Sequence, residues 1–398
     1  MSGVPEKARF FLERAVPQLR EFEAKGIFSP EEIRNLVRKR TDFEHLVLSP
    51  GNKPQDWLNY AAWEKSLESL RAKRCRRLQI RNSTTHAGTG RIFSILERAV
   101  NRHPADVNLW KEYLTYANAL KATKRYRKIM TRALRMHPAK PDLWTMAGRR
   151  SAANSDMQGA RNFFMRGTRF CARDATVWLE YARCEMEWLQ KMEARKSKKG
   201  GAEKAIKEQA EQTDDMIEFE EDDSDNDDGQ LVIPDPDRTA GNKKVISAAE
   251  EEKLKNNPAL DGAIPLAIFD ISRKQPFFKP ATAEQFFFVF ADFSNVSSQQ
   301  RLLQHVLDTM TTEFPNDPST AFCYIRQPLI GLQPSSSAYA KALQQALPRL
   351  RAALADSTNQ LQLADKITLW IQPVLALEDL DDSVRIVLQH TLDTLPKS

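Results

Sequence analysis

The residues that most often build catalytic or metal sites lack the spacing that such chemistry needs in this sequence. The four cysteines contain no CxxC pair, so we expect neither a zinc site nor a disulfide framework, and buried free thiols are the simpler interpretation. His103 and His137 both precede a proline at the same point of a repeated pattern, which favours a structural role. The six histidines therefore predict neither metal binding nor acid–base catalysis.

A phosphate-binding loop is not expected either. The glycine-rich stretch 87–91 lacks the Lys-Ser/Thr pair that such a loop needs, and no strand pattern precedes it. Carboxylates are dense only in the acidic tract 211–228, where a disordered chain cannot hold them in a fixed geometry. The sequence predicts a protein that is not an enzyme and that has no metal or cofactor.

Two dense groups of cations are the best candidates for a binding surface. At helical spacing, much of each group falls on one helix face, where it would neutralise phosphates or bind an acidic segment of a partner. A solvated helix face is the alternative interpretation. The first basic group is Arg71, Lys73, Arg74, Arg76, Arg77 and Arg81, of which Arg74, Arg77 and Arg81 share a face. The second basic group is Lys121, Lys124, Arg125, Arg127 and Lys128, all but Arg127 on a shared face.

The charge distribution along the chain is uneven. Residues 1–200 hold 41 Lys+Arg and 21 Asp+Glu, whereas residues 201–398 hold 18 and 32, although the net charge is only +6. This asymmetry indicates a polyanionic partner, internal pairing between the halves, or both. Within the acidic tract, Ser224 suits an acid-directed kinase of the casein-kinase-two type, and a solubilising linker is the alternative.

The elements that must position these residues follow a repeat of 34 residues. The segments LERAVNRHPADVNLWKEY, MTRALRMHPAKPDLWTMA and FMRGTRFCARDATVWLEY align along it, and each repeat fits two helices joined by a short turn. We expect the tryptophans to fill the interface between hairpins, with base stacking as the alternative, and the arginines to pair within the fold. The structural repeat positions are Trp57, Tyr60, Arg98, Trp110, Tyr113, Arg132, Trp144, Arg166, Trp178 and Tyr181.

Changes in pattern along the chain predict four segments. Residues 1–50 form an N-terminal helical segment in which Ser29, Pro30 and Glu32 open a helix with a capping box. Residues 51–195 form the repeat block, and residues 196–258 form a disordered charged linker with the acidic tract. Residues 259–398 form a divergent second helical block. The sequence contains no apolar run of about 18 residues, so we expect a soluble intracellular protein.

The repeat resembles the half-a-TPR (HAT) repeat in its Trp-x2-Tyr and Glu-Arg-Ala elements, seen at Trp57, Trp110 and Glu97. Glu64 and Glu185, each seven residues after its tryptophan, also match. The resemblance implies an all-α fold, an α-solenoid of HAT helical hairpins coiled as a right-handed superhelix. Such repeats are typical of scaffolds in RNA-processing assemblies.

The stretch 10–45, followed by LESLRAKR, is similar to the U-three small nucleolar RNA-associated family of HAT proteins. The resemblance implies a nucleolar scaffold in the UtpB subcomplex of the small-subunit processome, the 90S pre-ribosome. Implied partners are WD-repeat propeller subunits, the processome snoRNP and pre-rRNA, and the implied role is early 18S pre-rRNA processing in ribosome biogenesis. A HAT scaffold of pre-mRNA splicing or 3′-end processing, and a stand-alone RNA-binding module, remain alternatives.

Overall fold

The computed structural model describes residues 4–80, 85–205, 262–356 and 359–396, and in these ranges every regular element is a helix. The predicted all-α fold class is confirmed for this part of the chain. Contacts divide the chain into two compact units, of which the first comprises residues 1–150 and 162–171. The second unit comprises residues 151–161 and 172–398.

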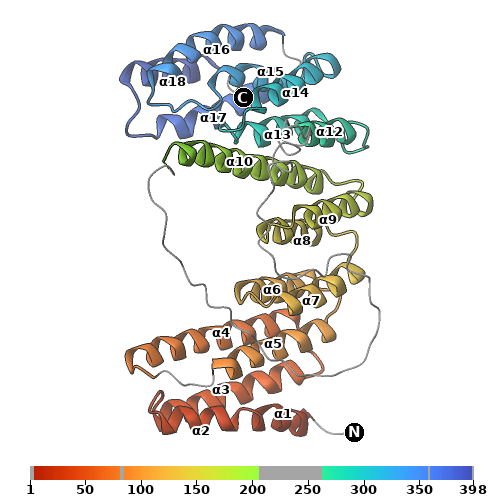
Figure 1. The fold of residues 1–398 in the computed structure, drawn as a ribbon, viewed down its shortest axis with the longest axis vertical. Helices are drawn as coiled ribbons and strands as arrows, with labels where there is room; N and C mark the ends of the chain where they lie inside the picture. The colour runs from red at the N-terminus through yellow and green to blue at the C-terminus, as the bar shows by residue number, and fades with distance from the viewer. Residues whose placement is uncertain (1–3, 81–84, 206–261, 357–358, 397–398) are drawn as a thin grey trace. The chain divides into compact units, whose positions relative to one another are not determined.

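The first unit is a succession of helices in chain order (Figure 1). From α3 to α6, each helix packs against the helix that follows it, and α1 and α2 both pack on α3. Its elements are α1 Val4–Glu13, α2 Val16–Ala24, α3 Pro30–Leu48, α4 Pro54–Arg77, α5 Thr85–Arg102, α6 Val107–Ala119, α7 Thr123–Met136, most of α8 Pro141–Ala153 and the C-terminal part of α9 Met157–Phe170.

Local sequence determines where these helices begin. At the start of α3, the Ser29 hydroxyl accepts from the Glu32 N–H at 3.2 Å, and the Glu32 carboxylate accepts from the Ser29 N–H at 2.8 Å. Pro30 occupies the first helical turn, where its missing N–H leaves no hydrogen bond unmade. The predicted capping box is therefore confirmed.

One hydrogen-bonding pattern recurs at the turns that precede three tryptophan-bearing helices. The Pro104 carbonyl accepts from Trp110 Nε1 at 2.9 Å and from His137 Nε2 at 2.7 Å. The Pro138 carbonyl accepts in the same way from Trp144 Nε1 at 2.7 Å and from the Cys171 thiol at 3.7 Å. Each turn is thereby tied both to the helix that follows it and to the end of the next hairpin.

An equivalent turn lies one hairpin earlier. There the side-chain oxygen of Asn52 takes the place of the proline carbonyl, accepting from Trp57 Nε1 at 3.3 Å and lying 2.5 Å from His103 Nε2. His103 and His137 thus make the same contact in successive hairpins. The structural role that the sequence favours for them is what the geometry shows.

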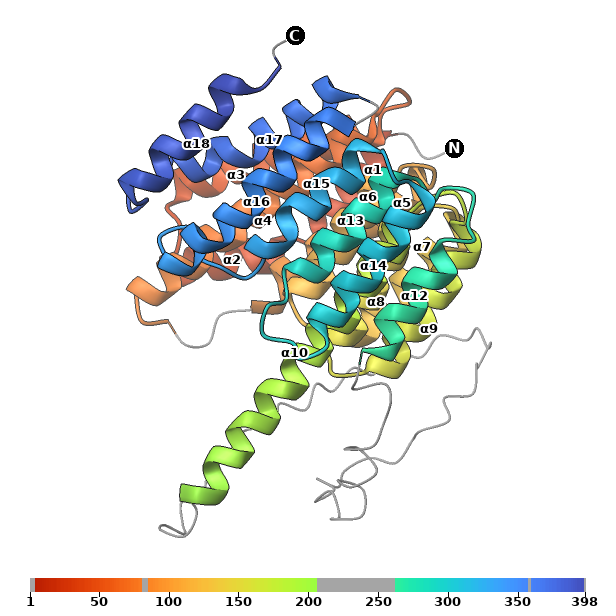
Figure 2. The ribbon, with the colours of Figure 1, turned by 90° about the horizontal axis from the view of Figure 1, so that it is seen from above.

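After residues 151–161, the second unit continues with the long helix α10, which packs on α12 and α13. Figure 2 shows α10 running past the ends of these two helices. The Glu193 carboxylate on α10 accepts from the hydroxyl of Ser297 at 2.7 Å. The elements of this unit are α10 Thr176–Ala205, α12 Ala263–Ser272, α13 Pro280–Ala291, α14 Gln299–Glu313, α15 Pro318–Arg326, a 3-10 turn Gln327–Leu329, α16 Ser337–Asp356, α17 Gln360–Leu375 and α18 Asp382–Thr394.

The segment predicted to be a disordered linker lies mostly outside the described residues. Helix α10 continues through residues 196–205, the first part of that segment. Residues 206–258, with the acidic tract and Ser224, are not among the residues that the structure describes. The core of the unit beyond them is aromatic, and Phe269, Phe286, Phe287 and Phe290 are completely buried there.

Candidate nucleic-acid interface

Part of the first basic group is engaged inside the first unit. Arg71 is only 3% exposed, and its guanidinium is bound to the Glu68 carboxylate one turn away at 2.5 Å. Arg74 forms a bidentate pair with Glu32 at 2.7 Å for both contacts, and it also donates to the Ile27 carbonyl. Arg71 thus makes its ion pair within α4, and Arg74 links α4 to the start of α3.

The Arg74 pair also changes the acidity of its partner. The hydrogen bond from Arg74, with a second from the Ser29 N–H, lowers the pKa of Glu32 from 4.5 to about 2. The same guanidinium lies over the Phe28 ring, 4.6 Å from its centroid. Arg74 therefore contacts Glu32 and Phe28 within the first unit, and its contact with RNA or an acidic partner stays a prediction.

The described residues include only part of the helix face expected for the first group. Helix α4 ends at Arg77, so it does not carry Arg81, which lies outside the described residues. Lys73, Arg76 and Arg77 are exposed. The first basic group thus offers three exposed cations near the C-terminal end of a helix, where the macrodipole already stabilises positive charge.

The second basic group is exposed throughout. Lys121 precedes α7 in a left-handed turn with φ of 55°, so it does not share the helical face that the spacing predicts. Lys124, Arg127 and Lys128 lie on α7 and face solvent, while the guanidinium of Arg125 covers the Phe93 ring at 4.3 Å. Helix α7 contains no Asp or Glu, so nothing on the helix itself neutralises these charges.

The repeated tryptophans lie in the interior. Trp57, Trp110, Trp144 and Trp178 are 2%, 1%, 5% and 7% exposed. A base cannot stack on a ring that is already covered on both faces. The structure thus places these rings in the hairpin packing, the first of the two interpretations open from the sequence.

The repeated tyrosines and arginines meet at shared carboxylates. Tyr60 donates to Glu44 at 2.9 Å, and Arg98 of the next hairpin binds the same carboxylate at 2.8 and 2.9 Å. One repeat later, Tyr113 donates to Glu97 at 2.6 Å and Arg132 binds Glu97 at 2.7 Å. Burial, with help from Glu97, raises the pKa of Tyr113, so the phenol remains a donor. We call each set a Tyr–Glu–Arg node.

A second type of ion pair joins an arginine to a glutamate of the repeat pattern, and the sequence predicts only the glutamate. Glu64 accepts from Arg40 at 2.8 and 3.0 Å, and Glu185 accepts from Arg161 at 2.7 and 2.9 Å. The sequence singles out both glutamates by their distance from a tryptophan but not their partners. The available signal is that each arginine stands 24 residues before its glutamate.

The sequence does not supply a complete Tyr–Glu–Arg node in every repeat. Arg166 on α9 is exposed, unlike Arg98 of the first node. Tyr181 is 8% exposed, and the residue 16 places before it, where Glu97 stands before Tyr113, is Met165. Burial raises the pKa of Tyr181 to about 12. The nodes are therefore complete in the first part of the repeat block and incomplete further along.

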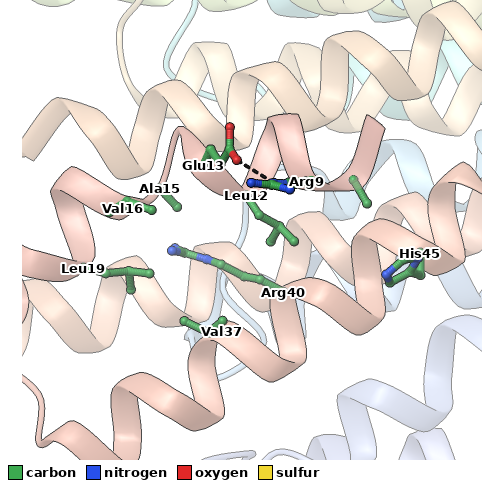
Figure 3. A pocket seen from close by; sticks show the side chains of 10 residues that line it. Arg9, Leu12, Glu13, Ala15, Val16, Leu19, Val37, Arg40 and His45 are labelled. Carbon is green, nitrogen blue, oxygen red and sulfur yellow. Dashed lines mark hydrogen bonds and ion pairs between the residues drawn. The ribbon is translucent and has the colours of Figure 1, made fainter. Parts of the chain in front are cut away.

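A pocket of about 320 Å³ lies among α1, α2 and α3 (Figure 3). Its wall is mainly aliphatic, with Leu12, Val16 and Leu19 facing the side chain of Arg40. Arg40 Nε and Nη2 both donate to Glu64, and Nη1 is buried without a hydrogen-bond partner. A pocket lined in this way suits an apolar side chain that lies near a hydrogen-bond acceptor for Arg40 Nη1.

Neither metal chemistry nor membrane insertion finds support in the part of the chain that the structure describes. Within it, no three His, Cys, Asp or Glu side chains come together in a way that would hold a metal ion. In the same residues, no helix combines the length and the apolar character needed to span a bilayer. All four cysteines are buried, and none of the four is in a disulfide bond.

Comparison with known proteins connects the N-terminal region to one family. Residues 12–92 match the family model of U3 small nucleolar RNA-associated protein 6. This region contains α2 to α4 and the Arg40–Glu64 and Arg74–Glu32 pairs. The matched residues thus include Glu44 and Tyr60 of the first Tyr–Glu–Arg node, whereas Arg98 of that node lies beyond them.

Curated relatives extend the similarity beyond that region. The chain is 34% identical over 194 residues to U3 small nucleolar RNA-associated protein 6 of Schizosaccharomyces pombe, covering 48% of this chain and 40% of that one. It is 26% identical over 193 residues to the Homo sapiens homolog, covering 46% and 32%. For the Dictyostelium discoideum homolog the identity is 23% over 339 residues, covering 79% and 52%. The matches therefore span about half or less of the relatives' own lengths.

Proposed function

We propose that this chain acts as a non-catalytic scaffold in the small-subunit processome and has a role in early 18S pre-rRNA processing. The observation that carries the proposal is the match of residues 12–92 to the family of U3 small nucleolar RNA-associated protein 6, together with the relatives of that name. A protein associated with the U3 small nucleolar RNA works in ribosome biogenesis. The proposal places this chain in the nucleolus, with snoRNP and pre-rRNA as its surroundings.

The architecture proposed for this role is an α-solenoid of HAT hairpins. Support comes from the recurrence of the Tyr–Glu–Arg node in successive hairpins and from the 34-residue spacing of the turns at Pro104 and Pro138. Stacked hairpins present long surfaces that bind peptides or folded proteins. WD-repeat propeller subunits of the UtpB subcomplex are the partners that we propose for these surfaces.

The exposed cations of α7 are proposed to supply an RNA contact. Lys124, Arg127 and Lys128 lie in the first half of the helix, where the macrodipole opposes positive charge. A bound polyanion would offset this unfavourable interaction between the cations and the helix dipole, and its binding would also release counterions. The first basic group, with Arg71 and Arg74 occupied within the fold, is the weaker candidate.

The test is affinity purification of the tagged protein from cells, with and without RNase, followed by identification of the recovered proteins and RNA. We expect propeller subunits in both samples and small nucleolar RNA in the untreated one. Recovery of splicing or 3′-end cleavage factors in their place would refute the assignment. Recovery of RNA without any protein partner would instead indicate a stand-alone RNA-binding module.

Charge reversal separates the two kinds of contact. The triple variant Lys124→Glu, Arg127→Glu and Lys128→Glu should reduce RNA recovery and leave the RNase-resistant protein partners in place. The matched control is the double variant Arg38→Glu and Lys39→Glu, which changes exposed cations of α3. Equal RNA recovery from both variants would show that α7 makes no RNA contact.

A further inference from the structure

One arginine of the repeat stands without the acceptors that its equivalents use. Arg132 on α7 is held by Glu97 and by the side chain of Asn101 on α5. One period of 34 residues later, Arg166 on α9 occupies the place of Arg132, and the two acceptor positions hold Thr131 and Arg135. The Thr131 hydroxyl is itself used, since it donates to the Arg127 carbonyl at 3.0 Å. A hydroxyl and a second guanidinium thus stand where the earlier repeat has a carboxylate and an amide.

The consequence is an accumulation of positive charge in this part of the first unit. Arg135 and Arg166 are both exposed, as is Arg169, one turn further along α9. No Asp or Glu occurs on α7 or from residue 162 to the end of α9. We call the exposed cations of these two helices the basic strip, leaving out Arg125, which lies over the Phe93 ring, and Arg132, which belongs to a node. Its members are Lys124, Arg127, Lys128, Arg135, Arg166 and Arg169.

The strip has the length of an extended ligand. Lys124 and Arg135 are eleven residues apart on one helix, which is about 16 Å at the helical rise per residue. The ends of α7 and α9 are tied together, because the Cys171 thiol that follows α9 contacts the Pro138 carbonyl that follows α7. Arg135, Arg166 and Arg169 can therefore continue the row that begins at Lys124. Several consecutive phosphates can be neutralised along it.

An exposed aromatic ring follows the last cation of the strip in the chain. Phe170, the last residue of α9, is 57% exposed although it is among the largest apolar side chains. One of its faces stacks on Trp144, with ring centroids 5.5 Å apart and an interplanar angle of 9°. Trp144 is itself fixed by its bond to the Pro138 carbonyl. Phe170 is thus held in place and stands next to Arg169 in the chain.

We propose that the basic strip and Phe170 bind single-stranded RNA, with phosphates along the cations and one base stacked on the Phe170 ring. Rigid aromatic rings beside guanidinium groups are the arrangement by which unpaired bases are held without sequence preference. An acidic protein segment would use the charges and gain nothing from the ring, and a duplex would keep its bases stacked inside. This inference rests on the proposed function and specifies the nucleic acid and the residues that contact it.

The ring is tested with the purified full chain and a fluorescein-labelled oligouridine of about 16 nucleotides. Phe170→Leu keeps an apolar cover on Trp144 but removes the aromatic face. We expect the dissociation constant measured by fluorescence anisotropy to rise about 5- to 100-fold. Phe170→Tyr, which keeps the face, should bind like the wild type. Unchanged binding by Phe170→Leu would overturn the stacking role.

The charges are tested through the salt dependence of the same binding. Arg166→Gln with Arg169→Gln should weaken binding and lower the slope of log K against log salt by about 0.7 for each phosphate that is no longer neutralised. The control is Arg38→Gln with Lys39→Gln, which removes two exposed cations of α3 and should leave the slope unchanged. Thermal unfolding followed by circular dichroism establishes that each variant is folded. Equal slopes for the two double variants would overturn the strip.

Competition identifies the class of ligand. Unlabelled oligouridine should displace the probe at lower concentration than a duplex RNA or polyglutamate of equal charge. Displacement by polyglutamate at the same concentration would assign the strip to an acidic protein segment and refute the RNA proposal. If the purified chain fails to bind oligouridine but small nucleolar RNA is still recovered with it from cells, only the basic strip is contradicted. Tight, strip-dependent binding without that recovery would contradict only the proposed function.

Discussion

Arg40 and Glu64 form an ion pair that solvent does not reach. Arg40 Nε and Nη2 donate to the two carboxylate oxygens at 2.8 and 3.0 Å, and the two side chains are 1% and 2% exposed. The pair joins α3 to α4 within the region matched by the family model. Removing one partner of such a pair leaves an uncompensated charge in the interior, whereas replacing both can be almost neutral.

The first prediction follows from that asymmetry. Glu64→Leu should lower the free energy of unfolding by about 3–5 kcal/mol, because Arg40 would remain buried without its acceptor. The double variant Arg40→Met and Glu64→Leu should recover most of the loss. Urea unfolding monitored by circular dichroism measures both. A double variant as unstable as the single one would show that packing, rather than charge, dominates at this site.

The second prediction concerns Trp110. Its indole is 1% exposed and its Nε1 donates to the Pro104 carbonyl, so Trp110→Ala removes packing and one hydrogen bond together. We expect the free energy of unfolding to fall by about 3–5 kcal/mol. Trp110→Phe, which retains much of the volume, should cost less. Losses below about 1 kcal/mol for Trp110→Ala, measured in urea, would contradict the interior position of this ring.

The third prediction uses Gly148 on α8. A Cβ built there would lie 2.5 Å from the nearest ring carbon of Phe164 on α9, well inside van der Waals contact. Alanine in a helix normally stabilises relative to glycine by about 1 kcal/mol, but overpacking here should reverse the sign and cost about 1–3 kcal/mol. Adding Phe164→Leu to Gly148→Ala should relieve the clash. A stabilising Gly148→Ala, seen as a higher melting temperature, would refute this contact.

The fourth prediction concerns the acid response of the Arg74–Glu32 pair. The pKa of Glu32 is about 2 in the folded protein, against 4.5 for the free group, so its ionised form is favoured by folding. The resulting stability is fully present above about pH 4.5 and is lost as the pH falls towards 2. The difference in unfolding free energy between the wild type and Glu32→Gln should therefore shrink over that interval.

The matched control for this pH series is Glu31→Gln, which changes an exposed carboxylate on the same turn and leaves the Arg74 contact in place. Urea unfolding at pH values from about 7 to 3 provides the comparison. A Glu32→Gln difference that stays constant down to pH 3 would mean that Arg74 does not hold this carboxylate in solution.

The sequence was informative where a pattern repeats or depends on neighbours in the chain. The 34-residue period predicts the helical class, the equivalence of His103 and His137, and the common place of the tryptophans. The capping box at Ser29 is local and was predictable from four residues. These features rest on periodicity and on short-range hydrogen bonds, which a single sequence displays directly.

Contacts between helices were the part that the sequence could not supply. Arg74 looked like one member of a basic face, but its partner Glu32 is on a different helix and 42 residues away. Lys121 fits a helical spacing, yet the turn before α7 places it in a left-handed conformation outside the helix. Conversely, the sequence alone does not show that Arg166 lacks equivalent acceptors. That is recognised only once the structure shows which residues accept from Arg132.

The turns at Pro104 and Pro138 have a consequence for how such a chain can change its length. Both carbonyls receive one donor from the following tryptophan and one from the end of the next hairpin. The segment between them is therefore an interchangeable module, with equivalent connectors at its two borders. Insertion or deletion of one whole period would preserve every connector. The turn at Asn52 shows that a longer hairpin can keep one too, because His103 lies 51 residues beyond Asn52 whereas His137 lies 33 residues beyond Pro104.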